Sequence, residues 1–214
     1  MGESLQSEGN QHIVALRPDV LNDAEHALGN LFQRMYHVTR VARDGLGPYA
    51  DRMSDTLQHL EKLLQLVFDY VSPVEIEIRP VDAARVVESL ASHVRQRAAG
   101  TIETPGCPST QVFADTRRLG RSFQLLTLAF QHEFSSASEI TIEVVPEGRR
   151  ECVDFLIHIV GVPGSVQDTQ AALAWEVAAR LIELQGGELA RTMEGEGCTC
   201  TVVLPMAGGG HGAD

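Results

Sequence analysis

The chain has 214 residues, 17 of them Lys or Arg and 29 Asp or Glu, which gives a formal net charge of −12 at pH 7. Such an acidic balance argues against nucleic acid, and against an anionic membrane surface, as the main partner. No apolar run approaches the roughly 20 residues that a helix needs to span a bilayer, and the polar N-terminus lacks the apolar stretch of a signal peptide. The sequence therefore predicts a cytoplasmic protein with no nucleic-acid or membrane partner.

The four cysteines, at positions 107, 152, 198 and 200, form no CxxC pair. Cys198 and Cys200 alternate along a predicted strand and face the same side of it. This spacing would let them approach a metal or another thiol, but it favours reduced side chains packed in a sheet. We therefore expect no metal site.

The N-terminal third of the chain has the pattern of two amphipathic helices, from Pro18 to about Gly45 and from Pro48 to about Tyr70. The break between them contains two glycines, and Pro48 suits the first turn of the second helix. The apolar stripes are Ala24, Leu28, Leu31, Met35, Val38 and Ala42 on the first helix and Met53, Leu57, Leu60, Leu64, Val67 and Val71 on the second. A hairpin cannot bury so wide an apolar seam alone. We expect two copies to pair as a four-helix bundle, in a homodimer.

The rest of the chain interleaves strands with helices and contains no internal repeats. Val74–Arg79 alternates apolar and polar residues as a half-buried strand does. Asp82 is placed to cap a helix over 83–99, and Asp115 to cap another that ends near Phe130. Further elements are strands over 140–145, 152–160 and 198–204 and a helix over 171–184. This order predicts an α/β sandwich with helices on one face of a mixed sheet, and an α+β chain as a whole.

Three segments carry a resemblance to the transmitter core of two-component histidine kinases. LLQLVFDYVSPVEIEIRPVDAARVVESL (63–90) is similar to that family's inter-domain segment, and VFADTRRLGRSFQLL (112–126) to a helix entry in its ATP-binding domain. AALAWEVAARLIELQGGELARTMEGEGCTCTVVLP (171–205) resembles the end of that domain, with its Gly-Gly turn, hairpin and closing strand. The resemblance implies a dimerisation and phosphotransfer hairpin at 18–73 and a degenerate ATPase-like domain at 74–206, between tails at 1–17 and 207–214.

In that family a histidine on the first helix accepts phosphate, and the string His26-Ala27-Leu28-Gly29-Asn30-Leu31-Phe32 matches the motif that surrounds it. The resemblance thus implies that His26 is the phosphoacceptor. Helix geometry supports this independently, since at about 100° per residue His26 lies on the side of the helix opposite most of the apolar seam and faces solvent. An exposed neutral imidazole can attack an acyl phosphate and pass the group on. The alternatives are an ordinary surface histidine at this position and His37, which lies on the same face three turns further on.

The neighbours of His26 depart from the family in part. Ala27 replaces the acid that supports autophosphorylation, and Glu25 points about 100° away from His26. Asn30 matches a position where the family often carries Thr or Asn, which implies an amide that orients water against the aspartyl phosphate of a response regulator. The alternative for Asn30 is a solvated polar residue.

The resemblance fails at the nucleotide site. Gln124 and Leu128 stand where the family has a magnesium-binding Asn, and Leu128 cannot bind a cation. No carboxylate for adenine follows the strand over 155–160, and Asp168 is out of register. Few residues remain for an ATP lid, and a loop at 161–164 is by itself weak evidence of a phosphate site. The glycines that should open the last helix are replaced by Ala171, Ala172 and Ala174. We therefore expect that neither ATP nor Mg²⁺ binds.

These features predict a histidine phosphotransferase that moves phosphate between response-regulator receiver domains through His26 without ATP. The alternatives are a non-catalytic pseudokinase that binds a receiver or a histidine kinase as scaffold or inhibitor, and a receiver phosphatase. The expected partners are a second copy of the chain, receiver domains and a histidine kinase. Arg34, Arg40 and Arg43 could complement an acidic receiver pocket, although charges on an open helix face are usually only solvated.

Overall fold

A computed structural model of the chain describes residues 18–42, 45, 47–72, 74–95, 101–104, 106–107, 109–146, 151–163, 169–194 and 197–207. The chain divides into two compact units. One comprises Met1–Gln58 with Val71–Pro73, and the other comprises His59–Tyr70 with Val74–Asp214. The division falls inside the second long helix, so that the last turns of this helix belong to the larger unit.

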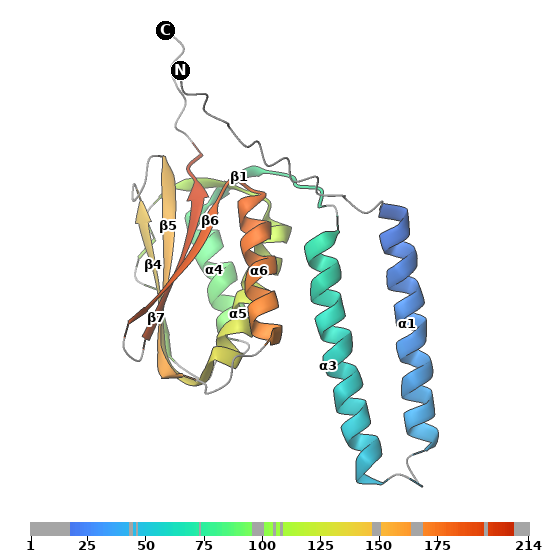
Figure 1. The fold of residues 1–214 in the computed structure, drawn as a ribbon. Coiled ribbons are helices and arrows are strands. Elements are labelled where there is room, and N and C mark those ends of the chain that lie inside the picture. The colour runs from blue at the N-terminus through green and yellow to red at the C-terminus, as the bar shows by residue number, and fades with distance from the viewer. Residues whose placement is uncertain are drawn as a thin grey trace, which may run out of the picture. The chain divides into compact units, whose positions relative to one another are not determined.

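The smaller unit is built from the antiparallel helices α1 (Pro18–Val41) and α3 (Pro48–Val71), of which α3 contributes its first half (Figure 1). Gly47 adopts a φ of +48°, a conformation that glycine reaches without strain, and Pro48 opens α3 as predicted. Phe32 and Thr39 of α1 and Ala50 and Leu57 of α3 are each 5% exposed or less. Among the residues that the structure describes in this unit, these four side chains are the buried ones.

The hairpin leaves most of its apolar stripes uncovered in a single chain. Leu31 is 50% exposed and Val38 is 62% exposed, although both belong to the seam predicted for α1. Further large apolar side chains exposed on the two helices are Met35, Val41, Tyr49, Met53, Leu60, Val67, Tyr70 and Val71. A single hairpin therefore satisfies only part of its apolar surface.

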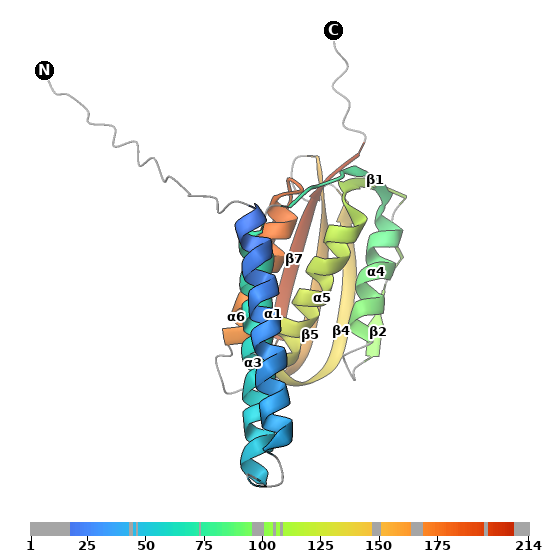
Figure 2. The ribbon, with the colours of Figure 1, turned by 90° about the vertical axis from the view of Figure 1, so that its right-hand side faces the viewer.

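The larger unit is a two-layer α/β sandwich, as predicted. Its main sheet has the strand order β2-β4-β5-β7-β6; β2 (Thr101–Glu103) runs parallel to β4 (Phe134–Pro146), and the other neighbours are antiparallel. The remaining strands of this sheet are β5 (Cys152–Pro163), β6 (Glu188–Glu194) and β7 (Gly197–Pro205). Three helices, α4 (Ala83–Arg95), α5 (Thr116–Glu133) and α6 (Thr169–Glu183), cover one face of the sheet (Figure 2).

The core lies between the helices and the sheet, and it follows from the period of each element. Alternate residues of β5 and β7 point inward and are fully or almost fully buried, Cys198 and Cys200 among them. Each helix places a three- and four-spaced apolar face against them. The largest side chains with less than 2% exposure include Leu90, Phe123, Leu126, Phe155, Ile157 and Ile182.

The strand predicted over 74–79 is displaced. Only Arg79–Asp82 forms a strand, β1, which pairs with β3 (Gln111–Ala114) in a separate two-stranded sheet. The Glu77 N–H donates to the carboxylate of Asp115 at 2.9 Å instead of joining a ladder. The strand prediction for 74–78 was wrong, because apolar alternation could not show that this segment bonds to a helix-capping carboxylate and not to another strand. The strands β2 and β3 were not predicted at all, because three or four residues carry too little periodicity.

Helix caps were predicted with more success at Asp115 than at Asp82. The Oδ1 atom of Asp115 accepts hydrogen bonds from the N–H groups of Arg117 and Arg118 at 3.0 and 3.1 Å, which is the geometry of an N-cap. The carboxylate of Asp82 accepts a hydrogen bond from Gln111 Nε2 at 3.1 Å and so links β1 to β3.

Within the described parts of the chain, no helix is long and apolar enough to cross a bilayer.

Candidate functional site on helix α1

His26 lies on the exposed face of α1. At about 100° per residue it is about 120–140° away from Phe32 and Thr39, the buried residues of this helix. Its side chain is exposed, as the sequence predicted, and so are the side chains of Glu25 and Ala27 beside it. The imidazole is therefore accessible to a partner protein.

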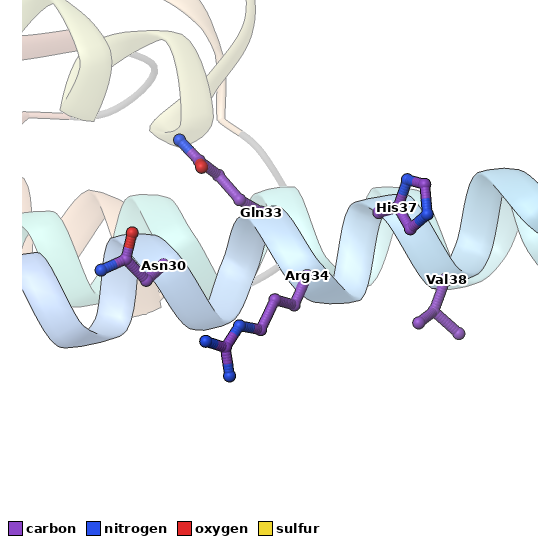
Figure 3. Close-up of a pocket in the computed structure, with 5 residues that line it drawn as sticks. All are labelled: Asn30, Gln33, Arg34, His37 and Val38. Atoms are coloured by element: carbon purple, nitrogen blue, oxygen red, sulfur yellow. The ribbon is translucent and has the colours of Figure 1, made fainter.

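Asn30 is also exposed and lies one turn after His26, about 40° around the helix and about 6 Å along its axis. It lines a shallow, open hollow of about 620 Å³ together with Gln33, Arg34, His37 and Val38 (Figure 3). Arg34 and Val38 project from one edge of the helix and Gln33 from the opposite edge, with Asn30 and His37 between them. The structure thus places Asn30 beside His37 and Arg34 in one hollow, which His26 does not line.

The ring of His37 is hydrogen-bonded to the side chain of Arg40. Its Nδ1 atom lies 3.4 Å from Nη2 of Arg40, one turn further along α1. A guanidinium can only donate, so Nδ1 of His37 is the acceptor in this hydrogen bond. The sequence marked His37 only as a rival of His26, and it gave no role to Gln33.

The positions that correspond to a nucleotide site carry apolar or internally paired side chains. Leu128 of α5 packs against the hydrophobic core, and Gln124 accepts a hydrogen bond from Arg121 Nη1 at 3.4 Å. Ala171 and Ala174 at the start of α6 are buried in the core cluster. Asp168 and the end of the loop at 161–164 lie outside the described residues.

Asp115 is bonded to several segments of the larger unit. Besides capping α5, it accepts the Glu77 N–H, and its own N–H donates to Oε1 of the buried Gln185 at 2.8 Å. Burial acts to raise the pKa of the Asp115 carboxyl. The N–H groups of Glu77, Arg118 and Arg117 and the charge of Arg117 outweigh it, and they hold this pKa below the ordinary value of 3.8. Asp115 therefore connects the segment after α3 with the start of α5 and with the residues that follow α6. Its role is structural.

The last turns of α3 belong to the same unit and are held by two arginines. Arg121 Nη2 of α5 pairs with Asp69 Oδ2 at 2.5 Å, and the guanidinium of Arg180 on α6 stacks over the Tyr70 ring at 5.1 Å. Leu66 is buried in the core of the unit. The end of the hairpin is thus packed into the α/β unit by apolar, ionic and cation–π contacts.

Metal binding has no support in the described residues, where no group of three or more His, Cys, Asp or Glu side chains is arranged to hold an ion. The sites that the sequence singled out are the exposed face of α1 and the segments that resemble a nucleotide site.

Solved structures of histidine kinases share the architecture described above. Full-length ShkA, solved in complex with AMPPNP, matches 90% of this chain at 19% sequence identity with a TM-score of 0.65. The Acinetobacter baumannii histidine kinase AdeS matches 85% of this chain, and 98% of its own chain is covered, at 16% identity with a TM-score of 0.56. This chain spans 46% of the ShkA chain.

No protein-family model matches the sequence, and a search of curated proteins finds no match either. The likeness to ShkA and AdeS is one of fold, at identities below 20%. The chain has the architecture of a histidine-kinase core, a helical hairpin followed by an ATPase-like α/β domain.

Proposed function

We propose that the protein is a histidine phosphotransferase that moves phosphate between receiver domains of response regulators through His26. The observation that carries the proposal is an exposed histidine on the first helix of a histidine-kinase-like hairpin, within a string that matches the family's phosphoacceptor motif. Residues 18–73 would serve dimerisation and phosphotransfer, and 74–206 would be a degenerate ATPase-like domain. The protein would act as a homodimer, with receivers and a histidine kinase as partners.

The reaction needs only the imidazole and the partner's acyl phosphate. A nitrogen lone pair of neutral His26 attacks the phosphorus of an aspartyl phosphate, forming an N–P bond while the bond from phosphorus to the carboxylate oxygen breaks. The aspartate leaves as a carboxylate, and the proton on the other ring nitrogen passes to solvent. Attack by the aspartate of a second receiver reverses these changes and delivers the phosphoryl group. Ala27 supplies no base, but an acyl phosphate is reactive enough to transfer without one.

The proposal includes the loss of ATP and Mg²⁺ binding. ShkA, of which this chain spans 46%, was solved in complex with AMPPNP. In this chain Leu128 packs into the core where a metal ligand is expected, and Ala171 and Ala174 are buried where glycines should approach phosphate. A phosphotransferase needs neither group, because its partner supplies the activated phosphate.

The test is phosphotransfer from a panel of phosphorylated receiver domains of the source organism to the full chain. We expect acid-labile label on the wild type, none on His26→Ala, and full labelling of His59→Ala, a control at an exposed histidine of α3. Equal labelling of His26→Ala would contradict the assignment of His26. Self-labelling with Mg²⁺–ATP would contradict the loss of nucleotide binding.

A second function is favoured by the position of Asn30. This exposed amide lies one turn from His26, as a residue that orients water against a receiver's aspartyl phosphate would. Faster loss of receiver phosphate without stable label, abolished in Asn30→Ala, would identify a phosphatase. Tight receiver binding with neither transfer nor dephosphorylation would instead identify a pseudokinase scaffold.

A further inference from the structure

Residues 72–78 connect α3 with β1, and such a connection is the natural place for a hinge. Compact units of one chain move relative to each other by default, unless their contacts prevent it. Hinges are usually a few loop residues that absorb the change in backbone angles. Residues 74–78 form neither helix nor strand, so a ladder of backbone hydrogen bonds does not hold them. The rigidity of this connection therefore depends on its contacts with side chains.

Helix α5 holds the connection at two points. The Glu77 N–H donates to Oδ2 of Asp115 at 2.9 Å, and Nε of Arg118 donates to the carbonyl oxygen of Glu75 at 3.4 Å. Asp115 caps α5, and Arg118 lies in the first turn of that helix. Val74 packs against the core of the larger unit as well. A backbone donor and a backbone acceptor of the connection are thus both satisfied by the start of α5.

Arginines of α5 and α6 hold the end of α3, immediately before the connection. Arg118 and Arg121 are three residues apart on α5, so they lie on one side of this helix. Arg121 reaches Asp69 of α3, with Nη2 2.5 Å from Oδ2. On α6, the guanidinium of Arg180 stacks on the ring of Tyr70, 5.1 Å from its centroid. The same two helices therefore contact α3 or the connection at four side chains, counting the capping carboxylate.

The closed arrangement combines one unfavourable feature with several favourable ones. Nε of Arg180 is buried without a hydrogen-bond acceptor, and an unpaired buried donor is destabilising. Against this, Leu66 is 4% exposed in the core of the larger unit, one turn before Tyr70. Detaching the last turns of α3 would expose Leu66 to water and break the polar contacts on either side of it together. Opening is therefore opposed by the sum of these contacts.

We propose that Arg118, Arg121 and Arg180 form a clamp that keeps this connection rigid, so that the larger unit does not swing about residues 72–78. The clamp acts as a whole: contacts at the end of α3 protect hydrogen bonds of the connection that they do not touch. It involves neither His26 nor a partner protein, so it holds whether or not the protein transfers phosphate.

The amide of Glu77 reports on the clamp, because its hydrogen bond to Asp115 exists only while the connection is closed. Hydrogen exchange is followed by NMR in the full chain and in the double variant Arg121→Gln/Arg180→Gln. We expect the wild-type amide to exchange at least about a hundredfold more slowly than an unprotected amide, and the double variant to exchange about tenfold faster than the wild type. Arg85→Gln, at an exposed arginine of α4, should change the rate by less than about twofold. An unprotected wild-type amide, or an unchanged rate in the double variant, would overturn the proposal.

Proteolysis distinguishes local opening of the clamp from loss of the whole fold. The side chains of Glu75 and Glu77 are exposed, but a glutamate-specific protease cuts after them only when the connection opens. We expect cleavage there to be about tenfold faster in the double variant, with cleavage after Glu143 in β4 unchanged. Equal acceleration at all three sites would show global unfolding and would refute a local clamp. If the arginine variant does not fold, Asp69→Asn/Tyr70→Leu removes the same two contacts from α3 and should give the same result.

Discussion

Gly187 illustrates how one residue decides the turn between α6 and β6. A Cβ atom added there would lie 2.4 Å from the carbonyl oxygen of Val203 and 2.9 Å from Cγ2 of Ile182. The preceding Gly186 has a φ of +78°, a conformation that other residues adopt only with strain. The turn thus requires glycine at 187 because the carbonyl of Val203 approaches closely, and at 186 because of the backbone conformation.

We therefore predict that Gly187→Ala lowers the free energy of unfolding by about 2–4 kcal/mol, because a backbone carbonyl cannot move aside as a side chain would. The control is Gly120→Ala within α5, where an added Cβ would meet nothing within 4 Å. This control should raise stability by about 0.5–1 kcal/mol, since alanine favours a helix over the unfolded chain. Urea unfolding measures both, and a neutral Gly187→Ala would refute the close approach.

Asp115 makes the stability of the larger unit depend on pH. Its pKa is held below 3.8 in the folded state, so its carboxylate stabilises the fold fully above the unfolded value. This contribution is lost as pH falls through the lowered folded pKa, because the protonated group cannot accept all three backbone N–H bonds.

The corresponding prediction concerns Asp115→Asn. The amide cannot accept both from Glu77 and from the start of α5, so the variant should lose about 1–3 kcal/mol at pH 7. Its stability should approach that of the wild type as pH falls from the unfolded value through the lowered pKa of the folded state, because the Asp115 carboxylate then becomes protonated. Asp82→Asn, at an exposed carboxylate, is the control. A stability difference that stays constant down to pH 2 would contradict the lowered pKa.

At the scale of elements, the most informative contact is that between the end of α3 and the helices of the α/β unit. Asp69 and Arg121 have side chains that are 27% and 40% exposed, and Tyr70 packs under Arg180 nearby. Partial burial limits the screening of this ion pair by solvent, although it does not remove it.

A double-mutant cycle with Asp69→Asn and Arg121→Gln should give a coupling energy of about 0.5–1 kcal/mol. The matched pair is Glu77 and Arg79, whose side chains are 71% and 70% exposed. Because both charges of that pair are in solvent, its coupling should be close to zero. A cycle for Asp69 and Arg121 that also gives no coupling would mean that Leu66 and Tyr70 hold the end of α3 without the ion pair.

At the scale of the whole molecule, the uncovered apolar stripe of the hairpin is the basis for the expected homodimer. Leu31 is 50% exposed in the single chain, and burying a leucine side chain stabilises by about 1.5–3 kcal/mol. A second hairpin that completes a four-helix bundle would supply that burial.

We predict that Leu31→Glu converts a dimer into a monomer in sedimentation velocity runs at micromolar concentration, because it places a charge in the bundle seam. Val160→Glu, a substitution of an apolar residue 47% exposed on β5, should leave the dimer intact. A wild-type monomer, or a Leu31→Glu dimer, would show that another surface is used.

Local patterns in the sequence predicted much of this protein. The periods of apolar residues placed α1, α3, α5 and α6 within a few residues of their observed bounds, and the exposure of His26 followed from helix geometry alone. The order of strands and helices predicted the two-layer sandwich. These features depend on residues close together in the chain, where hydrophobic period, caps and turn residues act directly.

Contacts between distant residues decided the rest. The pairing of β1 with β3, the parallel strand β2 and the anchoring of α3 by Arg121 and Arg180 join segments that no local pattern relates. The sequence by itself thus determined the elements and the exposed histidine, whereas the tertiary structure decided their partners, because the free energy of pairing depends on which surfaces folding brings together.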